Sequence, residues 1–265
     1  MDISIIILHY KNTAKTAKCL DSIKNSDLGA LAYETIVVDN GSGDDIAAIL
    51  KDRYPEAILI SSEKNLGMGG GNNLGIRKAR GEFLCVLNDD IVLKKDSLMI
   101  LYRQTRADDK IGLAAPKLIN SDGTFQPSGF RFPSLATPVL RRTFLGRYFK
   151  KYLDGYVAGE ADSGALRECD WIMGSCLFIR KSVLDKVGGF DERFFMYFED
   201  TDLCRRIWHA GFKVLYYPEA AVIHEHSRYS AQKPWYIAPF TDRLAREHIK
   251  SFIKYTWKWR NTRNS

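Results

Sequence analysis

The chain has 265 residues, a net charge of +7 at pH 7, 45% hydrophobic residues and 12% aromatic residues. This composition excludes a disordered chain, and the length fits one large α/β domain or two small ones. The basic excess is compatible with nucleotides, nucleic acid or an anionic membrane surface as partners.

The cysteines and the N-terminus indicate the compartment. The five cysteines are odd in number and contain no C-x-x-C pair, so we expect reduced thiols in a cytoplasmic protein. The chain enters a strand at once, and we expect no signal peptide. The early apolar run at residues 3–8 is too short to span a bilayer.

Strand and helix signals alternate through the first ninety residues. Apolar runs at residues 3–8, 34–38, 57–60 and 83–87 predict strands. Helices are expected after Asn12, which can cap a helix, after Asp44 or Asp45, and after the glycine-rich residues 65–73. This alternation predicts an α/β protein with a Rossmann-like, mostly parallel central sheet and helices on both faces.

Asp89 and Asp90 directly follow the predicted strand at residues 83–87. Ligands bind at the carboxyl ends of strands in open α/β sheets. Two adjacent carboxylates there suit a hard divalent cation that shares a substrate diphosphate. Asn and Asp are also ordinary turn residues, and taken alone the triplet Asn88-Asp89-Asp90 favours a plain turn.

The glycine-rich stretch at residues 65–73, NLGMGGGNN, could bind phosphate through backbone amides. It fits neither the dinucleotide fingerprint, which should follow the first strand, nor a P-loop. We therefore interpret most of these glycines as a turn that lets the next helix pack closely. Asn65 and Asn73 are the better candidates for ligand contacts.

The second half of the chain is less regular. A helix is expected around residues 98–102 and a strand at residues 111–115, but the pattern dissolves over residues 120–165. The basic-aromatic block at residues 141–152 is either a lid or binding loop, or a solvated surface. Residues 171–179 then predict one buried strand, in which Gly174 marks a close approach.

Glu199 and Asp200 follow an aromatic run at residues 194–198 and can open a helix. They could be simple caps, because acids are favoured at helix N-termini. Apolar surroundings would also raise the pKa of a carboxylate and suit a general base. Strands are expected at residues 213–217 and 220–223. Of the two histidines that follow, His224 and His226, either one is a metal ligand or the two form a hydrogen-bonded surface pair.

Residues 242–260 predict an amphipathic cationic helix with an adjoining apolar stripe. Such a helix either lies on an anionic membrane or packs on its own domain. We expect no nucleic-acid partner, because the chain lacks a helix-turn-helix pattern, zinc spacing and an RNA-recognition signature.

Taken together and in order, six stretches resemble the family 2 glycosyltransferases of the GT-A fold, most closely the rhamnosyltransferase-like branch. They are SIIILHYKN, VVDNGSGD, NLGMGGGNNLGI, GEFLCVLNDD, WIMGSCLFIRKSVLDKVGGFDERFFMYFEDTDLCRR and VIHEHS. The resemblance implies a GT-A domain over residues 1–230, with a donor-binding half at about 1–115 and an acceptor-binding half at about 116–230. Residues 231–265 would form a basic helical extension.

The resemblance also implies roles for single residues. Asp200 would be the catalytic base, and Asp90 and His224 would hold Mg²⁺ or Mn²⁺. The positions expected to bind the nucleotide sugar are Tyr10, Asn12, Asp39, Asn40, Asn65, Asn73, Asp89, Gly174 and Glu199.

The implied reaction is transfer of a sugar, with inversion, to a hydroxyl of a glycan or lipid-linked oligosaccharide acceptor. The donor would be a dTDP- or UDP-sugar, and dTDP-L-rhamnose is the first candidate. The pathway would be bacterial O-antigen or capsule synthesis. The protein would work in the cytoplasm, with peripheral contact to the inner face of the membrane. Alternatives are a sugar nucleotidyltransferase, disfavoured because no basic glycine-rich loop follows the first strand, and a non-catalytic carbohydrate- or membrane-binding module.

Overall fold

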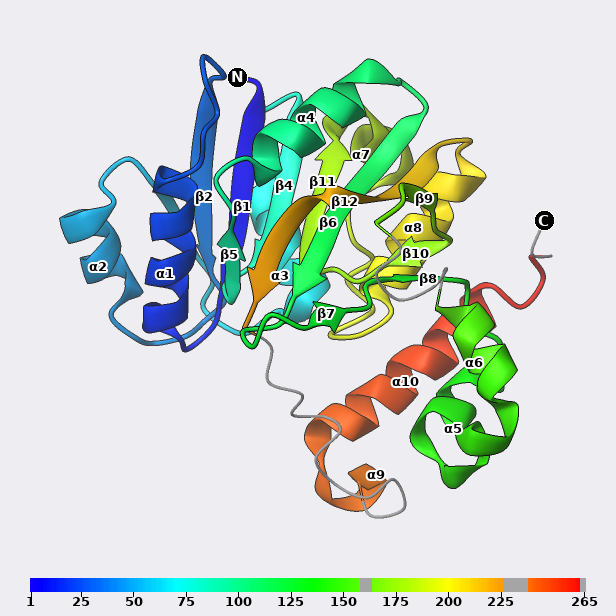
Figure 1. The fold of residues 1–265 in the computed structure, drawn as a ribbon. Coiled ribbons are helices and arrows are strands. Elements are labelled where there is room, and N and C mark those ends of the chain that lie inside the picture. Colours follow the sequence, from blue (N-terminus) through cyan, green and yellow to red (C-terminus); the bar gives the residue numbers. More distant parts are fainter. Residues whose placement is uncertain (158–163, 226–237, 263–265) are drawn as a thin grey trace.

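The computed structural model describes residues 1–157, 164–225 and 238–262. Within them a mixed central sheet has the strand order β3-β2-β1-β4-β11-β6-β12-β5 (Figure 1). Its strands are β1 Ile3–His9, β2 Tyr33–Asp39, β3 Ile58–Ser61, β4 Phe83–Asn88, β5 Ile91–Leu93, β6 Ile111–Ile119, β11 Cys176–Arg180 and β12 Lys213–His224. Strands β3, β2, β1 and β4 are mutually parallel, as predicted.

Helices cover both faces of this sheet. One face carries α1 Thr13–Lys24, α2 Ile46–Arg53 and α4 Ser97–Ala107, and the other carries α3 Gly67–Lys78, α7 Lys181–Val187 and α8 Glu199–His209. Successive side chains of a strand point to opposite faces. Accordingly, Ile5 and Ile7 of β1 join the core cluster of α1, whereas Ile6 and Leu8 join that of α8. The predicted α/β architecture is confirmed.

The sheet is not parallel throughout. Strand β11 lies between β4 and β6 and runs antiparallel to both, while β6 and β12 pair in parallel. The prediction of two strands within residues 213–223 is wrong, because β12 continues through both segments with a register irregularity between Tyr217 and Ala221.

The single strand predicted over residues 171–179 is also wrong. Trp171–Ile172 forms β10, which pairs with β8 Gly129–Phe130 in a separate two-stranded sheet, and β11 starts only at Cys176. Two further short strands flank the main sheet, β7 Phe125–Gln126 beside β6 and β9 Arg167–Glu168 beside β12.

Helix α3 begins inside the glycine run, at Gly67, and not after it as predicted. A Cβ on Gly71 would lie 2.4 Å from Leu8 Cδ1, and one on Gly75 would lie 2.4 Å from Ile6 Cγ2. The helix therefore packs on β1 at a separation that only glycine permits. This packing offsets the low helix propensity of glycine, which costs about 1 kcal/mol per residue relative to alanine.

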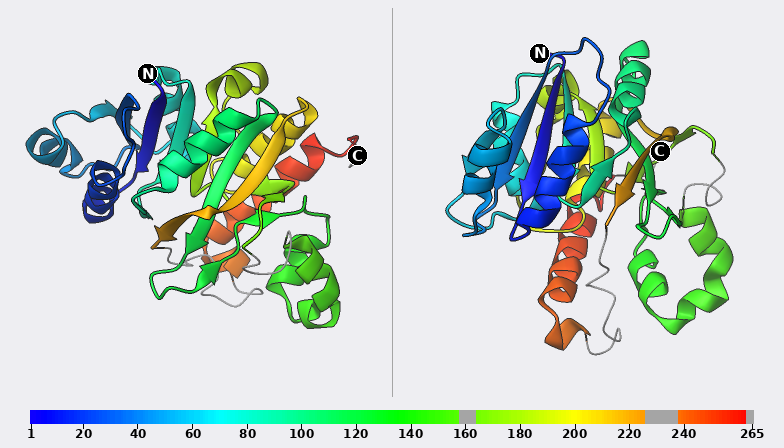
Figure 2. Two further views of the ribbon diagram at one scale, coloured as in Figure 1. Left: turned by 45° about the horizontal axis from the view of Figure 1, so that its top comes forward. Right: turned by 60° about the vertical axis from the view of Figure 1, so that its left-hand side comes forward.

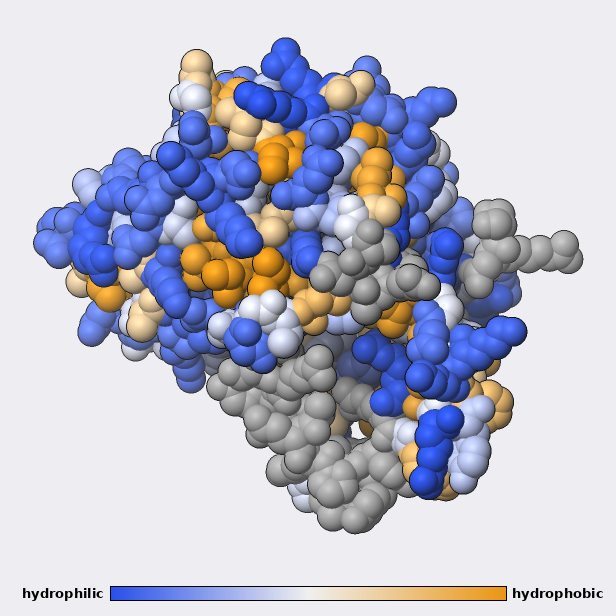
Figure 3. All heavy atoms as spheres, in the orientation of Figure 1, coloured by the Kyte–Doolittle hydropathy of each residue, from blue (hydrophilic) through white to orange (hydrophobic). Residues whose placement is uncertain are grey.

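Two helical segments project beyond the edge where the parallel strands end (Figures 1 and 2). One consists of α5 Thr137–Arg142, the 3₁₀-helix η1 Phe144–Phe149 and α6 Lys150–Tyr156; the other of α9 Ala238–Thr241 and α10 Arg243–Lys258. The first lies where the sequence pattern dissolved, and hydrophilic and hydrophobic residues are interspersed on its surface (Figure 3).

The described helices include none that combines the length and the apolar character needed to cross a bilayer. All five cysteines are buried and free. His226 and the expected boundary at residues 230–231 lie outside the described residues.

Candidate active site

Polar residues gather where strands β1, β2 and β4 end. The strand register pairs His9 with Asp39 and Leu8 with Asn88. Tyr10, Asn40 and Asp89, which follow these partners in the chain, therefore share one edge of the sheet. This is the edge at which open α/β sheets bind ligands.

Asp90 meets His224 at this edge because β12 pairs with β5, with His224 opposite Ile91. Asp90 Oδ1 lies 3.3 Å from His224 Nε2, and Gln126 Oε1 lies 2.9 Å from His224 Nδ1. An amide that accepts from Nδ1–H directs Nε2 toward the carboxylate, and hydrogen-bond partners of this kind orient metal-binding histidines in the same way.

The described residues contain no group of three or more His, Cys, Asp or Glu side chains that could hold a metal. Two protein ligands are nevertheless compatible with Mg²⁺ or Mn²⁺, which take further ligands from substrate phosphates and water. The carboxylate of Asp90 and the imidazole of His224 are suitable donors, so these two residues fit the predicted metal.

The two neighbouring aspartates differ in their electrostatics. Burial and then the charge of Asp90 raise the pKa of Asp89 to about 7, against a hydrogen bond from the Tyr10 backbone. Burial would also raise the pKa of Asp90, but His224 and Lys15 outweigh it and lower the value. Asp90 is therefore the carboxylate that stays ionised, as a metal ligand must.

Two residues of this edge were missed by the sequence analysis. Lys15 Nζ lies 3.5 Å from Asp90 Oδ2 and 3.0 Å from the carbonyl oxygen of Glu225. His9 is fully buried, with Nδ1 2.7 Å from Thr16 Oγ1 and Nε2 3.0 Å from Asp44 Oδ1. Neither had a sequence signal, because each contact joins segments that only the fold brings together.

Asn40 and Asn65 shape the turn that leads into α3. Asn40 Oδ1 accepts from Leu66 N at 2.9 Å, and its amide nitrogen donates to Gly67 O at 3.1 Å and to Asn65 Oδ1 at 3.2 Å. Asn65 Oδ1 also accepts from Gly67 N at 2.8 Å. Hydrogen bonding to Asn65 lowers the pKa of Tyr10, which is 41% exposed and accessible to a ligand.

The remaining donor-side residues also have internal partners. Asn12 caps α1 by accepting from Lys15 N, as predicted, and Asp39 Oδ1 accepts from Ser42 N at 2.9 Å. Asn73 donates to Phe190 O at 2.8 Å and accepts from Phe190 N at 2.9 Å. Asn73 therefore fixes the loop that leads to Asp200.

Asp200 lies buried in the first turn of α8, with only 9% of the residue exposed. Its Oδ2 accepts from Gly174 N at 2.9 Å and its Oδ1 from Thr201 N at 2.7 Å. A Cβ on residue 174 would lie 3.3 Å from Asp200 Cβ, which explains the close approach predicted at that glycine.

Burial raises the pKa of Asp200 despite the hydrogen bonds from Gly174 and Thr201. Burial and the charge of Asp200 raise the pKa of Glu199 well above its ordinary value, and Glu199 Oε2 is buried without a hydrogen-bond partner among the described residues. The hydrogen bonds from Gly174 and Thr201 favour the ionised form of Asp200, so Asp200 is the better candidate for the base.

The two pairs of acids are joined through the end of β4 and the residues that precede β11. Asn88 N donates to Ser175 O at 3.0 Å, and the adjacent Gly174 donates to Asp200. The structure therefore brings the predicted metal ligands and the predicted base to the same end of β4.

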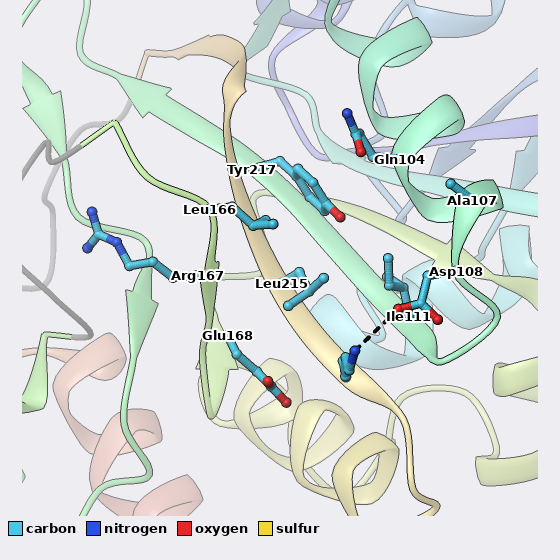
Figure 4. A pocket seen from close by; sticks show the side chains of 10 residues that line it. Gln104, Ala107, Asp108, Ile111, Leu166, Arg167, Glu168, Leu215 and Tyr217 are labelled. Carbon is cyan, nitrogen blue, oxygen red and sulfur yellow. Dashed lines mark hydrogen bonds and ion pairs between the residues drawn. The ribbon is translucent and has the colours of Figure 1, made fainter.

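A pocket of about 370 Å³ lies elsewhere (Figure 4). It is lined by Ile111 and Lys213, which start β6 and β12, and by Asp108 and Arg167. Strand starts lie at the opposite edge from Asp89 and His224, so this pocket is separate from the candidate site.

Comparison with solved structures identifies the class of fold. The crystal structure of GalNAc-T7 with UDP, GalNAc and Mn²⁺ matches 99% of this chain with a TM-score of 0.70 at 14% sequence identity. The chain spans about half of that protein, 48% of its length. The mixed α/β sheet with its carboxyl-edge acids is thus a GT-A glycosyltransferase fold.

Sequence comparison narrows this class to one family. Glycosyl transferase family 2 matches residues 4–187, and a related family, Glycosyl transferase family group 2, matches residues 137–259. The chain belongs to glycosyltransferase family 2, as the resemblance predicted.

Two curated relatives are rhamnosyltransferases. The N-acetylglucosaminyl-diphospho-decaprenol L-rhamnosyltransferase of Mycobacterium tuberculosis is 30% identical over 231 residues, which cover 82% of this chain and 73% of the relative. Rhamnosyltransferase WbbL of Escherichia coli K12 is 26% identical over 264 residues, which cover 95% and 91% of the two chains.

Proposed function

We propose that this glycosyltransferase transfers L-rhamnose from dTDP-L-rhamnose to a hydroxyl of a lipid-linked glycan in bacterial surface polysaccharide synthesis. The main support for transfer to a hydroxyl is the Asp200 carboxylate, which is buried, has a raised pKa and lies beside the end of β4. The donor and the acceptor class are supported by the names of the two rhamnosyltransferase relatives. Another UDP- or dTDP-sugar is the alternative donor.

The proposed chemistry divides between the two pairs of acids. Asp200 takes the proton of the acceptor hydroxyl, which attacks the anomeric carbon directly and inverts it. Asp90 and His224 would hold Mg²⁺ or Mn²⁺, which neutralises charge on the leaving diphosphate. The GalNAc-T7 structure was determined with UDP and Mn²⁺, which supports this choice of metal.

We propose that the first half of the chain, about residues 1–115, binds the donor and that about residues 116–230 bind the acceptor. Tyr10, Asp39 and Asp89 would contact the nucleotide, because they lie together at the strand ends. Asn12, Asn40, Asn65 and Asn73 would act by fixing the surrounding loops, given their internal hydrogen bonds.

The products distinguish the proposal from a nucleotidyltransferase. We expect dTDP-L-rhamnose and an N-acetylglucosaminyl-diphospho lipid with a shortened polyprenyl chain to yield TDP and an α-linked rhamnoside in the presence of Mn²⁺. Chromatography of the nucleotide and NMR of the new linkage measure both. Release of pyrophosphate from dTTP and rhamnose 1-phosphate, with no TDP from the first mixture, would instead establish the nucleotidyltransferase.

We further propose a peripheral contact between α10 and an anionic cytoplasmic membrane face. Ile253 and Trp257 are 59% and 66% exposed, and Arg246, Lys250 and Lys254 lie on the same helix. Exposed apolar side chains with neighbouring cations suit an anionic interface. Lys258 does not belong to this surface, because it pairs with the buried Asp202.

This contact predicts binding to vesicles that contain phosphatidylglycerol but not to vesicles of phosphatidylcholine alone. Replacing both Ile253 and Trp257 with alanine removes the apolar carbons that would enter the membrane, and we expect a loss of binding of about tenfold or more in a sedimentation assay. Alanine replacements of Ile58 and Tyr33, exposed residues in β3 and β2, are the controls. Equal binding by both double variants would remove α10 from the membrane contact.

A further inference from the structure

The turn directly before Glu199 and Asp200 has an unusual backbone. Tyr197 and Phe198 have φ angles of 68° and 66°, and Phe198 is the N-cap of α8. Left-handed conformations are unfavourable for bulky residues and persist only where the surrounding structure holds them. The position of Asp200 therefore depends on the tertiary contacts that stabilise this turn.

Helix α10 contacts the turn directly. Ser251 Oγ donates to Met196 O at 2.8 Å. The ring of Phe198 lies 5.6 Å from that of Phe252 and 5.3 Å from that of Tyr255. These contacts come from a segment more than fifty residues later in the chain, so the turn is stabilised by tertiary packing and not by its own sequence.

The carboxyl end of α10 is bound to the same helix that carries the base. Lys258 Nζ lies 2.6 Å from Asp202 Oδ1 and 2.8 Å from Asp191 Oδ2, and Trp259 Nε1 donates to Asp202 Oδ1 at 2.9 Å. Asp202 is fully buried and follows Asp200 by two residues. Losing a partner of a buried charge is costly, so this contact fixes α10 against α8.

The amino end of α10 reaches the donor side of the site. The guanidinium of Arg243 lies 5.7 Å from the ring centroid of Phe195. After Asn65 and Lys11, the charge of Arg243 also contributes to the lowered pKa of Tyr10. One helix therefore spans the site from the exposed tyrosine of the donor side to the helix of the base.

We propose that α10 is the positioning element of the catalytic base: its inner face, formed by Ser251, Phe252 and Tyr255, holds Tyr197 and Phe198 in the left-handed conformation that presents Asp200. This inference rests on the proposed function, because it takes Asp200 to be the base. The residues of α10 act through the turn and do not touch the reacting atoms.

Phe252→Ala and Ile249→Ala form a matched pair of tests, because Phe252 packs on Phe198 and Ile249, on the same helix, is exposed. With the short-chain acceptor, we expect Phe252→Ala to lower kcat about tenfold or more, because small displacements of catalytic groups are costly, and to leave the donor KM within about twofold. Ile249→Ala should match the wild type. Amide hydrogen exchange at residues 196–202 should accelerate only in Phe252→Ala.

Rescue separates positioning from a general loss of structure. Glycine adopts positive φ without strain, so Tyr197→Gly added to Phe252→Ala should restore part of kcat. If Phe252→Ala fails to fold, Ser251→Ala, which loses only the hydrogen bond to Met196, replaces it in both measurements.

The outcomes separate this inference from the proposed function. Unchanged kcat and unchanged exchange at residues 196–202 in the inner-face variant would overturn the positioning role, whatever Asp200 does. Full activity of Asp200→Asn would instead overturn the base itself. Accelerated exchange in Phe252→Ala would then still show that α10 holds the turn, but no longer that it positions a catalytic group.

Discussion

Asp200→Asn should abolish sugar transfer and leave TDP binding intact. A positioned general base contributes about 10²- to 10⁴-fold to a reaction rate, and asparagine cannot take the proton of the acceptor hydroxyl. Asp200 accepts its hydrogen bonds from Gly174 N and Thr201 N, and asparagine has nearly the same shape as aspartate, so nucleotide affinity should not change. Initial rates with dTDP-L-rhamnose and calorimetric titration with TDP measure the two quantities.

The matched control is Asp185→Asn, which changes an exposed carboxylate on α7. Its rate should equal that of the wild type. Thermal unfolding of both variants should be compared, because an asparagine at 200 has one fewer acceptor for the two backbone N–H groups. A folded Asp200→Asn protein with normal transfer would end the assignment of the base.

The same carboxylate predicts a pH dependence. Burial raises the pKa of Asp200, and the base acts only when it is deprotonated. The rate should therefore fall as the pH is lowered through this raised pKa, at a higher pH than for an ordinary aspartate. A pH profile of kcat for the wild type measures this acid limb, and a rate that stayed constant down to the pH at which an ordinary aspartate protonates would contradict the prediction.

The donor half of the fold could be read from the sequence because its signals are local. The apolar runs of β1, β2 and β4 are short and continuous, and parallel strands bring their carboxyl ends together. The acids after β4 were therefore predicted at the carboxyl edge of the sheet, whereas the roles of the residues after β1 and β2 came from the family resemblance. Asn12 was recognised as a cap for the same reason, since its contact lies three residues away.

The remaining features depend on contacts between distant segments. Helix α3 contains several glycines because its close packing on Ile6 and Leu8 leaves no room for a Cβ. This packing outweighs the low helix propensity of glycine. The direction of β11 is not encoded in its apolar periodicity. Lys15 and Asp90 are 75 positions apart in the chain, so no local pattern predicts their contact.

The C-terminal helix shows why two interpretations of one pattern can both be partly right. Its amphipathic periodicity left membrane contact and domain packing equally open. In the structure Phe252 packs on the turn at residues 196–198, while Ile253 and Trp257 are exposed. The helix therefore packs on its own domain through Phe252, and its exposed residues remain available for the proposed membrane contact.

Asp90→Ala should remove the effect of Mn²⁺ on TDP binding. Substitutions of residues that only orient a metal ligand cost about 10- to 100-fold in affinity, so removal of a direct ligand should cost about 100-fold or more. The pKa of Asp90 is lowered by His224 and Lys15, so the wild-type carboxylate is ionised and ready to bind a cation. Calorimetric titration of TDP with Mn²⁺, and again with EDTA, measures the metal-dependent part of binding.

Asp96→Ala is the control for this measurement, because Asp96 is exposed, lies six residues away and makes no side-chain cap for α4. Asp90→Asn separates charge from packing, since its amide can still hydrogen-bond to His224 and is a poor ligand for Mn²⁺. We expect both Asp90 variants to bind TDP equally with Mn²⁺ and with EDTA, at the affinity that the protein side chains alone supply. If Asp90→Ala kept the full Mn²⁺ enhancement, the metal would have to bind without this carboxylate. A wild type that bound TDP equally with Mn²⁺ and EDTA would point to Lys15, which lies 3.5 Å from Asp90, as a cation available to the diphosphate.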